Sequence, residues 1–141
     1  MTDAEGRALV LAEPLSLWGG MDPSTGEVID AHHPQRGANL AGRVVVMASG
    51  RGSSSSASVL AEAVRTGKAP AAILVGEPDL ILAIGAEVAD ELYGGRVPVV
   101  VLAPDELSAI RDGAVVRVGP DGVRTVGTAS TTAGSRKRRS R

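Results

Sequence analysis

The chain has 141 residues, enough for one compact domain, and a domain of this size buries roughly 68–70% of the surface that its unfolded chain exposes. Trp18 and Tyr93 are its only aromatic residues, which argues against the base-stacking surfaces of single-stranded nucleic-acid binders. It has no cysteine, so it forms no disulfide and offers no thiolate to a zinc or iron–sulfur site. We expect no metal site in this chain, and any such centre must be held by another polypeptide.

The net charge of −1 is unevenly distributed along the chain. The last six residues hold five of the fifteen basic side chains, so the 135 residues before them carry ten basic and sixteen acidic groups. A terminal run of like charge is usually solvated. We therefore expect one domain over residues 1–127 and a disordered basic tail over residues 128–141, with nucleic-acid binding unlikely. The N-terminus lacks the basic start and apolar run of a signal peptide, which predicts a cytoplasmic protein with no membrane partner.

Strand and helix patterns alternate through the first half of the chain. Residues 7–12 and 26–29 have the composition of short strands, separated by a loop rich in glycine and proline. Residues 43–48 are a continuous apolar run, typical of a strand covered on both faces. Residues 59–66 repeat apolar side chains at helical spacing before the stop signals Gly67 and Pro70. With a buried strand over 71–75, they predict a strand–loop–helix–strand unit with a right-handed crossover between parallel strands.

The second half predicts further short elements of both kinds. Residues 80–84 fit a strand or the start of a helix, residues 86–92 a helix that Gly94 and Gly95 end, residues 98–102 a strand, and residues 105–110 a short helix. Residues 114–118 and 123–126 flank a Gly-Pro-Asp-Gly turn, which predicts a β-hairpin. The expected fold class is therefore α/β.

The segment SGRGSSSS, residues 49–56, lies between the predicted strand 43–48 and the following helix. Serine runs are often flexible linkers, but a linker joins separately folded units, whereas this segment lies within one crossover. Gly50 and Gly52 suit a tight turn, and the free N–H groups at the helix start favour an anion. One serine is expected as the N-cap, which leaves other hydroxyls for function. We name residues 50–54 the serine loop.

Several known motifs do not fit the serine loop. A Walker sequence is absent, and the dinucleotide fingerprint lacks its third glycine. A serine-hydrolase triad is poorly supported, because His32 and His33 are the only histidines and the sequence does not show which serine they approach. Arg51 is either a solvent-exposed side chain or a two-point contact for a substrate carboxylate.

Two segments carry a family resemblance: PLSLWGGMDPSTGEVIDAHHPQRGANLAGRVVVMASGRGSSSS over residues 14–56, and GKAPAAILVGEPDLILAIGAEVADE over residues 67–91. Their order and spacing resemble the small, swivelling subunit of the aconitase X family. The resemblance implies a single swivelling β/β/α domain with a mixed sheet that closes over a large aconitase X catalytic subunit. That subunit would hold the iron or iron–sulfur centre and most substrate contacts. The implied activity is that of a heteromeric hydro-lyase acting on a hydroxy acid such as mevalonate 5-phosphate or cis-3-hydroxy-L-proline, inactive without the large subunit.

The resemblance also implies roles for individual residues. The serine after Gly-Arg-Gly is the proton acceptor in the family, and Ser53 holds that position here. Arg51, Gly52, Ser54 and His33 are the expected substrate-binding residues. The alternative is a non-catalytic lid or regulatory module that holds an anion with the same loop. A phosphohistidine-carrying swivel domain is disfavoured, because residues 50–58 contain no histidine.

Overall fold

The computed structural model describes residues 4–49 and 55–127, so the predicted tail over 128–141 lies outside the described residues. The strands are β1 (Ala4–Val10), β2 (Val44–Met47), β3 (Ala72–Val75), β4 (Val99–Val101), β5 (Val115–Gly119) and β6 (Gly122–Gly127). The helices are α1 (Leu17–Gly20), α2 (Ser56–Thr66), α3 (Leu80–Tyr93) and α4 (Pro104–Ser108). All six strands join one sheet in the order β4-β3-β2-β1-β5-β6.

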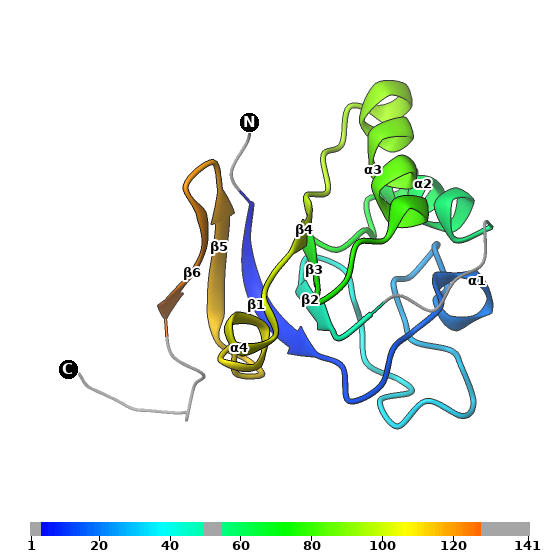
Figure 1. The fold of residues 1–141 in the computed structure, drawn as a ribbon. Coiled ribbons are helices and arrows are strands. Elements are labelled where there is room, and N and C mark those ends of the chain that lie inside the picture. The colour runs from blue at the N-terminus through cyan, green and yellow to red at the C-terminus, as the bar shows by residue number, and fades with distance from the viewer. Residues whose placement is uncertain (1–3, 50–54, 128–141) are drawn as a thin grey trace.

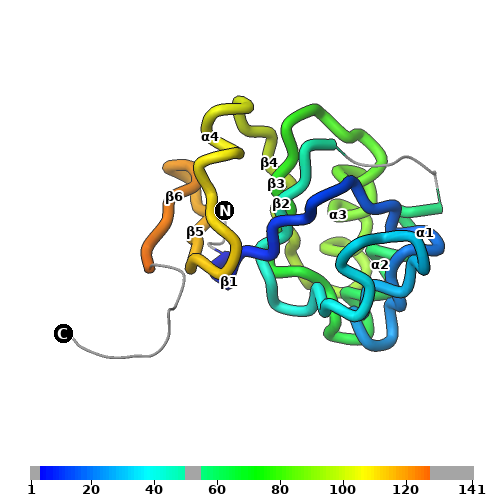
Figure 2. The backbone as a smooth tube through the Cα atoms, turned by 90° about the horizontal axis from the view of Figure 1, so that it is seen from below, coloured from blue at the N-terminus to red at the C-terminus, as the bar shows by residue number. Residues whose placement is uncertain are grey.

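The sheet is mixed, as the sequence predicts. Strands β1 to β4 are parallel to one another, whereas β5 pairs antiparallel with β1 and with β6. Every residue of β2 and β3 is buried, which explains why both strands read as unbroken apolar runs. Helices α1, α2 and α3 lie on one side of the central strands, and α4 lies with the β5–β6 hairpin on the other (Figures 1 and 2). The α/β class and the mixed sheet are therefore confirmed.

A separate apolar cluster fills each side of the sheet. On the helix side, Leu60 and Ala63 of α2 pack with Ile73 and Val75 of β3. On the opposite side, a second cluster joins residues of the central strands to β5 and to Ile110 after α4. Burial of this kind stabilises by about 25 cal/mol for each Å² of apolar surface removed from water. Apolar side chains thus cover both faces of the central strands.

The predicted order of strand, loop, helix and strand and the parallel pairing of the two strands are confirmed. Strand β2 leads through the serine loop into α2, and α2 returns to β3, which pairs in parallel with β2. Helix α2 ends at Gly67, whose φ of 76° is left-handed, and the Lys68 N–H donates to the Ala63 carbonyl at 2.8 Å. This is the termination that glycine at that position predicts.

Helix α3 is one continuous element, whereas the sequence prediction gave residues 80–84 and 86–92 as two separate elements. The helix runs without a break through Gly85. Its start is fixed by Asp79, whose carboxylate accepts a hydrogen bond from the Leu82 N–H at 3.0 Å. A Cβ at Gly85 would lie 2.9 Å from the Ala57 Cα, so the glycine permits α2 and α3 to approach rather than ending a helix.

Other boundaries also differ from expectation. Strand β1 begins at Ala4, earlier than predicted, because its first half pairs with β5. The predicted strand at residues 26–29 makes only isolated bridges, between Met21 and Val28 and between Glu27 and Asn39. The hairpin is confirmed, with Gly119 opposite Gly122 and two residues between them. Within the described residues, no helix has the length and apolar character needed to cross a membrane.

Candidate functional site at the carboxyl edge of the parallel strands

The four parallel strands end at one edge of the sheet, and the serine loop leaves from the middle of it. Strand β2 lies between β1 and β3, so residues 48 and 49 emerge between two neighbouring strand ends. The Gly76 N–H, which follows β3, donates to the Ala48 carbonyl at 2.9 Å. A Cβ at Gly76 would lie 2.8 Å from that carbonyl oxygen, so the two strand exits touch through backbone alone. This edge of an open parallel sheet is where such folds commonly bind ligands.

The serine loop itself lies outside the described residues, as do the predicted site residues Arg51, Gly52, Ser53 and Ser54. The structure describes both of its flanks. It leaves from β2 through Ser49, and it ends where Ser55 precedes the first residue of α2. The roles of these four residues therefore stay predictions.

The start of α2 is held by a buried serine. Ser56 is 4% exposed, and its hydroxyl accepts a hydrogen bond from the Trp18 N–H at 3.3 Å. The first turn of α2 contains no acidic residue, so no carboxylate within that turn offsets the partial positive charge of the helix start. This electrostatic setting favours a negative group on the preceding loop.

A hollow of about 420 Å³ opens beside the exit of β2. It lies over the ends of β1, β2 and β3, with α4 on its other side, and Ala48 and Leu107 are part of its lining. Glu77 is the one charged side chain among the ten described residues that line it. A space of this size and apolar character fits a small molecule or an inserted side chain of a partner protein.

His33 lies at the same edge of the sheet, near the exit of β1. The residue is 5% exposed; Nε2 donates to the Glu13 carbonyl at 3.0 Å, and Nδ1 accepts from the Gln35 N–H at 3.1 Å. Both ring nitrogens are thus engaged within the chain, with the proton on Nε2. In this geometry His33 orients the segment after β1. Its predicted contact with substrate stays a prediction, because the serine loop lies outside the described residues.

Gln35 is a positioning residue that the sequence interpretation missed. Its side-chain NH₂ group donates to the Val10 carbonyl at 2.8 Å, and its side-chain oxygen accepts from the Ala12 N–H at 2.7 Å. The two bonds close the end of β1. No local pattern marks this glutamine, because its partners lie more than twenty residues away in the sequence.

The Asp-Pro-Ser-Thr-Gly segment at residues 22–26 builds a turn. The Asp22 carboxylate accepts from the Ser24 hydroxyl at 2.6 Å and from the Ser24 N–H at 2.9 Å. These hydrogen bonds favour the ionised form and lower the pKa of Asp22 below its usual value. Gly26 completes the turn with a φ of 86°. The segment therefore has a structural role.

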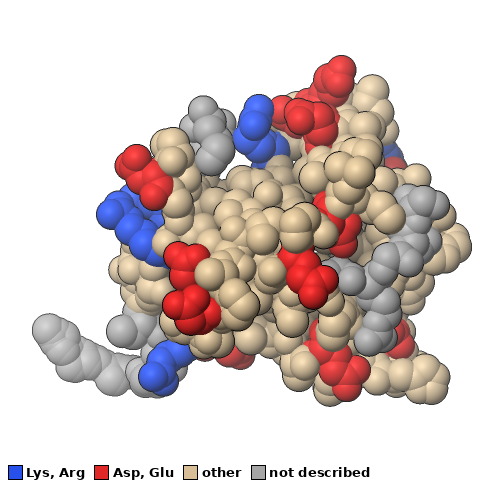
Figure 3. All heavy atoms as spheres, viewed as in Figure 1, with Lys and Arg blue, Asp and Glu red and all other residues tan. Residues whose placement is uncertain are grey.

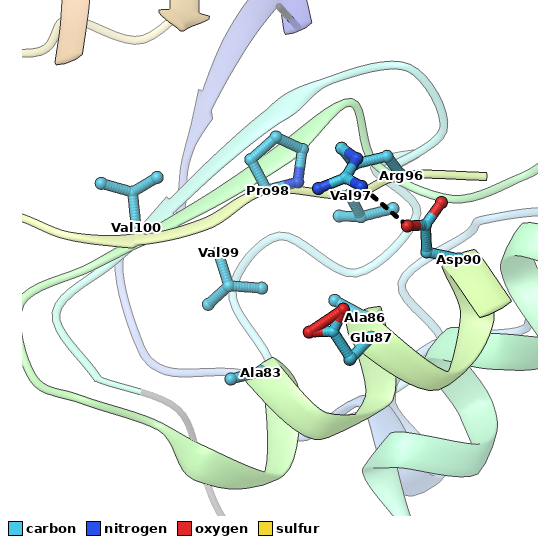
Figure 4. Close-up of a pocket in the computed structure, with 9 residues that line it drawn as sticks. All are labelled: Ala83, Ala86, Glu87, Asp90, Arg96, Val97, Pro98, Val99 and Val100. Atoms are coloured by element: carbon cyan, nitrogen blue, oxygen red, sulfur yellow. Dashed lines mark hydrogen bonds and ion pairs between the residues drawn. The ribbon is translucent and has the colours of Figure 1, made fainter. Parts of the chain in front are cut away.

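A second groove, of about 260 Å³, lies between α3 and the segment that leads into β4 (Figure 4). Arg96 and Asp90 form an ion pair across it at 2.9 Å, and the remaining lining is mostly apolar. Its α3 residues include Ala83 and Glu87, which point away from the helix face that packs on α2. The groove therefore lies on the side of α3 that faces away from α2.

The described residues do not provide a metal site. They contain no group of three or more histidine, cysteine, aspartate or glutamate side chains placed to hold an ion. With no cysteine in the sequence, this part of the chain does not fit an iron–sulfur centre. On the face shown in Figure 3, acidic and basic side chains lie side by side near α3 and near the β5–β6 hairpin.

The fold and its carboxyl-edge loop define an α/β domain of the swivel class. The family profile for the aconitase X swivel domain matches residues 1–126, and the chain belongs to this family. A solved structure of aconitase X from Thermococcus kodakaraensis, in its holo form, has a TM-score of 0.78 and 37% identity. The similarity covers 89% of this chain and 91% of that one.

Two kinds of relative share this domain. Cis-3-hydroxy-L-proline dehydratase from Pseudomonas aeruginosa is 51% identical over 108 residues, which are 75% of this chain and 19% of that protein. The phosphomevalonate dehydratase small subunit from Thermococcus kodakarensis is 39% identical over 118 residues, which are 84% of this chain and 83% of that protein. This chain therefore spans about a fifth of the first relative and most of the second.

Proposed function

We propose that the chain is the small, swivelling subunit of a two-subunit hydro-lyase that removes water from a hydroxy acid. The observation that carries this proposal is the match of one family profile across residues 1–126, a family whose relatives include proteins named as dehydratases. One of these relatives is itself named as a small subunit and is covered over 83% of its length. The partner is then a large aconitase X subunit.

In this proposal Ser53 accepts the proton that the reaction removes. Dehydration breaks a C–H bond and the neighbouring C–O bond. The deprotonated Ser53 oxygen takes the proton, the C–H electron pair forms the new C=C bond, and the hydroxyl group leaves as hydroxide on the side of the large subunit. The proton that Ser53 releases afterwards and this hydroxide together make up the water that is lost. A serine is a poor base in water, so its alkoxide needs stabilisation. The start of α2 supplies N–H groups and partial positive charge directly after the loop, and Arg51 adds a full charge nearby.

The substrate contacts proposed for this chain are Arg51, Gly52 and Ser54, whereas His33 acts through the segment that it orients. Gly52 lets the loop backbone approach it, and Ser54 offers a second hydroxyl beside the base. His33 supports the edge from the β1 side through its contacts with Glu13 and Gln35. We assign the iron or iron–sulfur centre expected for this family to the large subunit, because the described residues here lack its ligands.

The substrate is one of two hydroxy acids in this proposal. We put cis-3-hydroxy-L-proline, or a related hydroxy acid, first, and the 51% identity to the Pseudomonas aeruginosa enzyme supports this choice. Mevalonate 5-phosphate is the second candidate, because the small subunits of phosphomevalonate dehydratase match over most of their length.

Co-expression with the large subunit tests the proposal. The purified complex is assayed for loss of each substrate and for its dehydrated product. We expect turnover of one substrate by the complex and none by the small subunit alone. The proposal fails if the complex turns over neither substrate. The anion-holding lid predicts a different result, namely anion-dependent thermal stabilisation of the isolated chain and full activity of a Ser53→Ala complex.

A further inference from the structure

Helix α3 carries a row of apolar side chains on its solvent side. Leu80, Ile84, Val88 and Leu92 recur at every fourth residue and are 73%, 49%, 40% and 65% exposed. We call these four residues the α3 stripe. A surface helix normally presents polar side chains to water, and an exposed apolar row marks an interaction surface.

The stripe lies close to the start of α2. On an α-helix, Ile84 and Val88 project within about 100° of Gly85, and Gly85 packs against Ala57 in the first turn of α2. The opposite side of α3 faces the β4 groove of Figure 4. Trp18, 59% exposed, is tied through its N–H to Ser56 in the same first turn of α2. Exposed apolar side chains thus flank the helix start at which the serine loop ends.

The charges on α3 are all of one sign. Glu87, Asp90 and Glu91 are its only charged residues, and Asp90 is paired with Arg96. A partner protein that covers the stripe therefore needs an apolar surface at its centre. Lysine or arginine at the rim of that surface would lie near the carboxylates of Glu87 and Glu91.

We propose that the large subunit of the dehydratase docks on the α3 stripe and on Trp18, through an apolar surface rimmed with basic side chains. This inference rests on the proposed function. In the Pseudomonas aeruginosa relative about four-fifths of the chain lies outside the matched region, so a large body of protein accompanies this domain there. A substrate held by such a body must reach the serine loop. The stripe and Trp18 border the helix start that follows this loop, so the approaching subunit covers them.

Binding measurements on the full chain test the docking surface. The probe is the large subunit from the same organism, identified as the homologue of the four-fifths of the relative that lie outside the matched region. Ile84→Glu and Val88→Glu place a charge in the stripe, and Val126→Glu on β6 is the matched control, because Val126 is similarly exposed at 43%. We expect the dissociation constant to rise at least about tenfold for the stripe variants and less than about twofold for the control. Melting curves of the isolated chains should match the wild type.

The outcomes separate this inference from the proposed function. If the wild type binds the large subunit and both stripe variants bind equally well, the docking surface is wrong and the proposed function stands. If the wild type binds no large subunit, both fail. If the isolated wild type is a dimer that the stripe variants dissociate, while their affinity for the large subunit is unchanged, the stripe binds a second copy of this chain instead.

Discussion

Replacing Gly85 with alanine tests the close packing of α3 against the start of α2. The new Cβ would lie 2.9 Å from the Ala57 Cα and 3.1 Å from the Ala57 carbonyl oxygen, and because both are backbone atoms one helix must move. Overpacking of this kind costs about 1–3 kcal/mol, whereas alanine returns about 1 kcal/mol of helix propensity. We expect a net loss of about 1 kcal/mol, which lowers the Tm by roughly 3–6 °C for a domain of this size.

The same substitution should also lower activity in the complex. Ala57 lies in the first turn of α2, so a displaced helix start moves the end of the serine loop, and misplacement by about 1 Å costs up to about 100-fold in rate. Thermal unfolding of the isolated chain and kcat of the complex at 25 °C measure the two effects. Ala83→Gly, on the groove side of α3, is the control; it should lose about 1 kcal/mol through propensity alone and keep its activity. A higher Tm for Gly85→Ala would show that propensity dominates and would refute the close packing.

Three further substitutions test individual contacts. Ser56→Ala removes the acceptor of the Trp18 N–H and should cost about 1–2 kcal/mol in urea unfolding; unchanged stability would show that the bond contributes nothing. His33→Ala removes a buried ring and both of its hydrogen bonds, and we expect a loss of about 2–3 kcal/mol in the same assay, with an unaltered unfolding midpoint as the contrary result. The hydrogen bonds from Ser24 lower the pKa of Asp22. At acidic pH, the folded state therefore binds fewer protons at Asp22 than the unfolded state, and the free energy of unfolding rises with pH. The stabilisation by Asp22 is therefore present above the usual aspartate pKa and is lost as the pH falls through the lowered value; Asp22→Asn should weaken the decline in stability below about pH 4, and identical pH profiles would oppose this.

The sequence predicted those elements whose cause is local. Strands β2 and β3 are unbroken apolar runs because both of their faces are covered, and the β5–β6 turn carries its own turn residues. The prediction left Gly85 between two separate segments, whereas one helix runs through it and the glycine permits contact with α2. Residues 26–29 form bridges rather than a strand because their partners are single residues of a loop.

The candidate site was predictable to a similar extent. The position of the serine loop between β2 and α2 followed from the order of local patterns, and the resemblance selected Ser53 within it. The supporting contacts carry no such signal. Ser56 bonds Trp18 across 38 positions, and Gln35 bonds Val10 across 25, so only the folded chain brings these partners together.

The proton-accepting role of Ser53 is tested most directly by Ser53→Ala in the complex with the large subunit. We expect the complex to form with wild-type affinity and kcat to fall by about 10²–10⁴-fold, the usual contribution of a positioned acid or base. Ser49→Ala, which removes a hydroxyl outside the serine loop, is the matched control and should retain most of the activity. Full turnover by the Ser53→Ala complex would contradict the account and leave the chain as a non-catalytic lid.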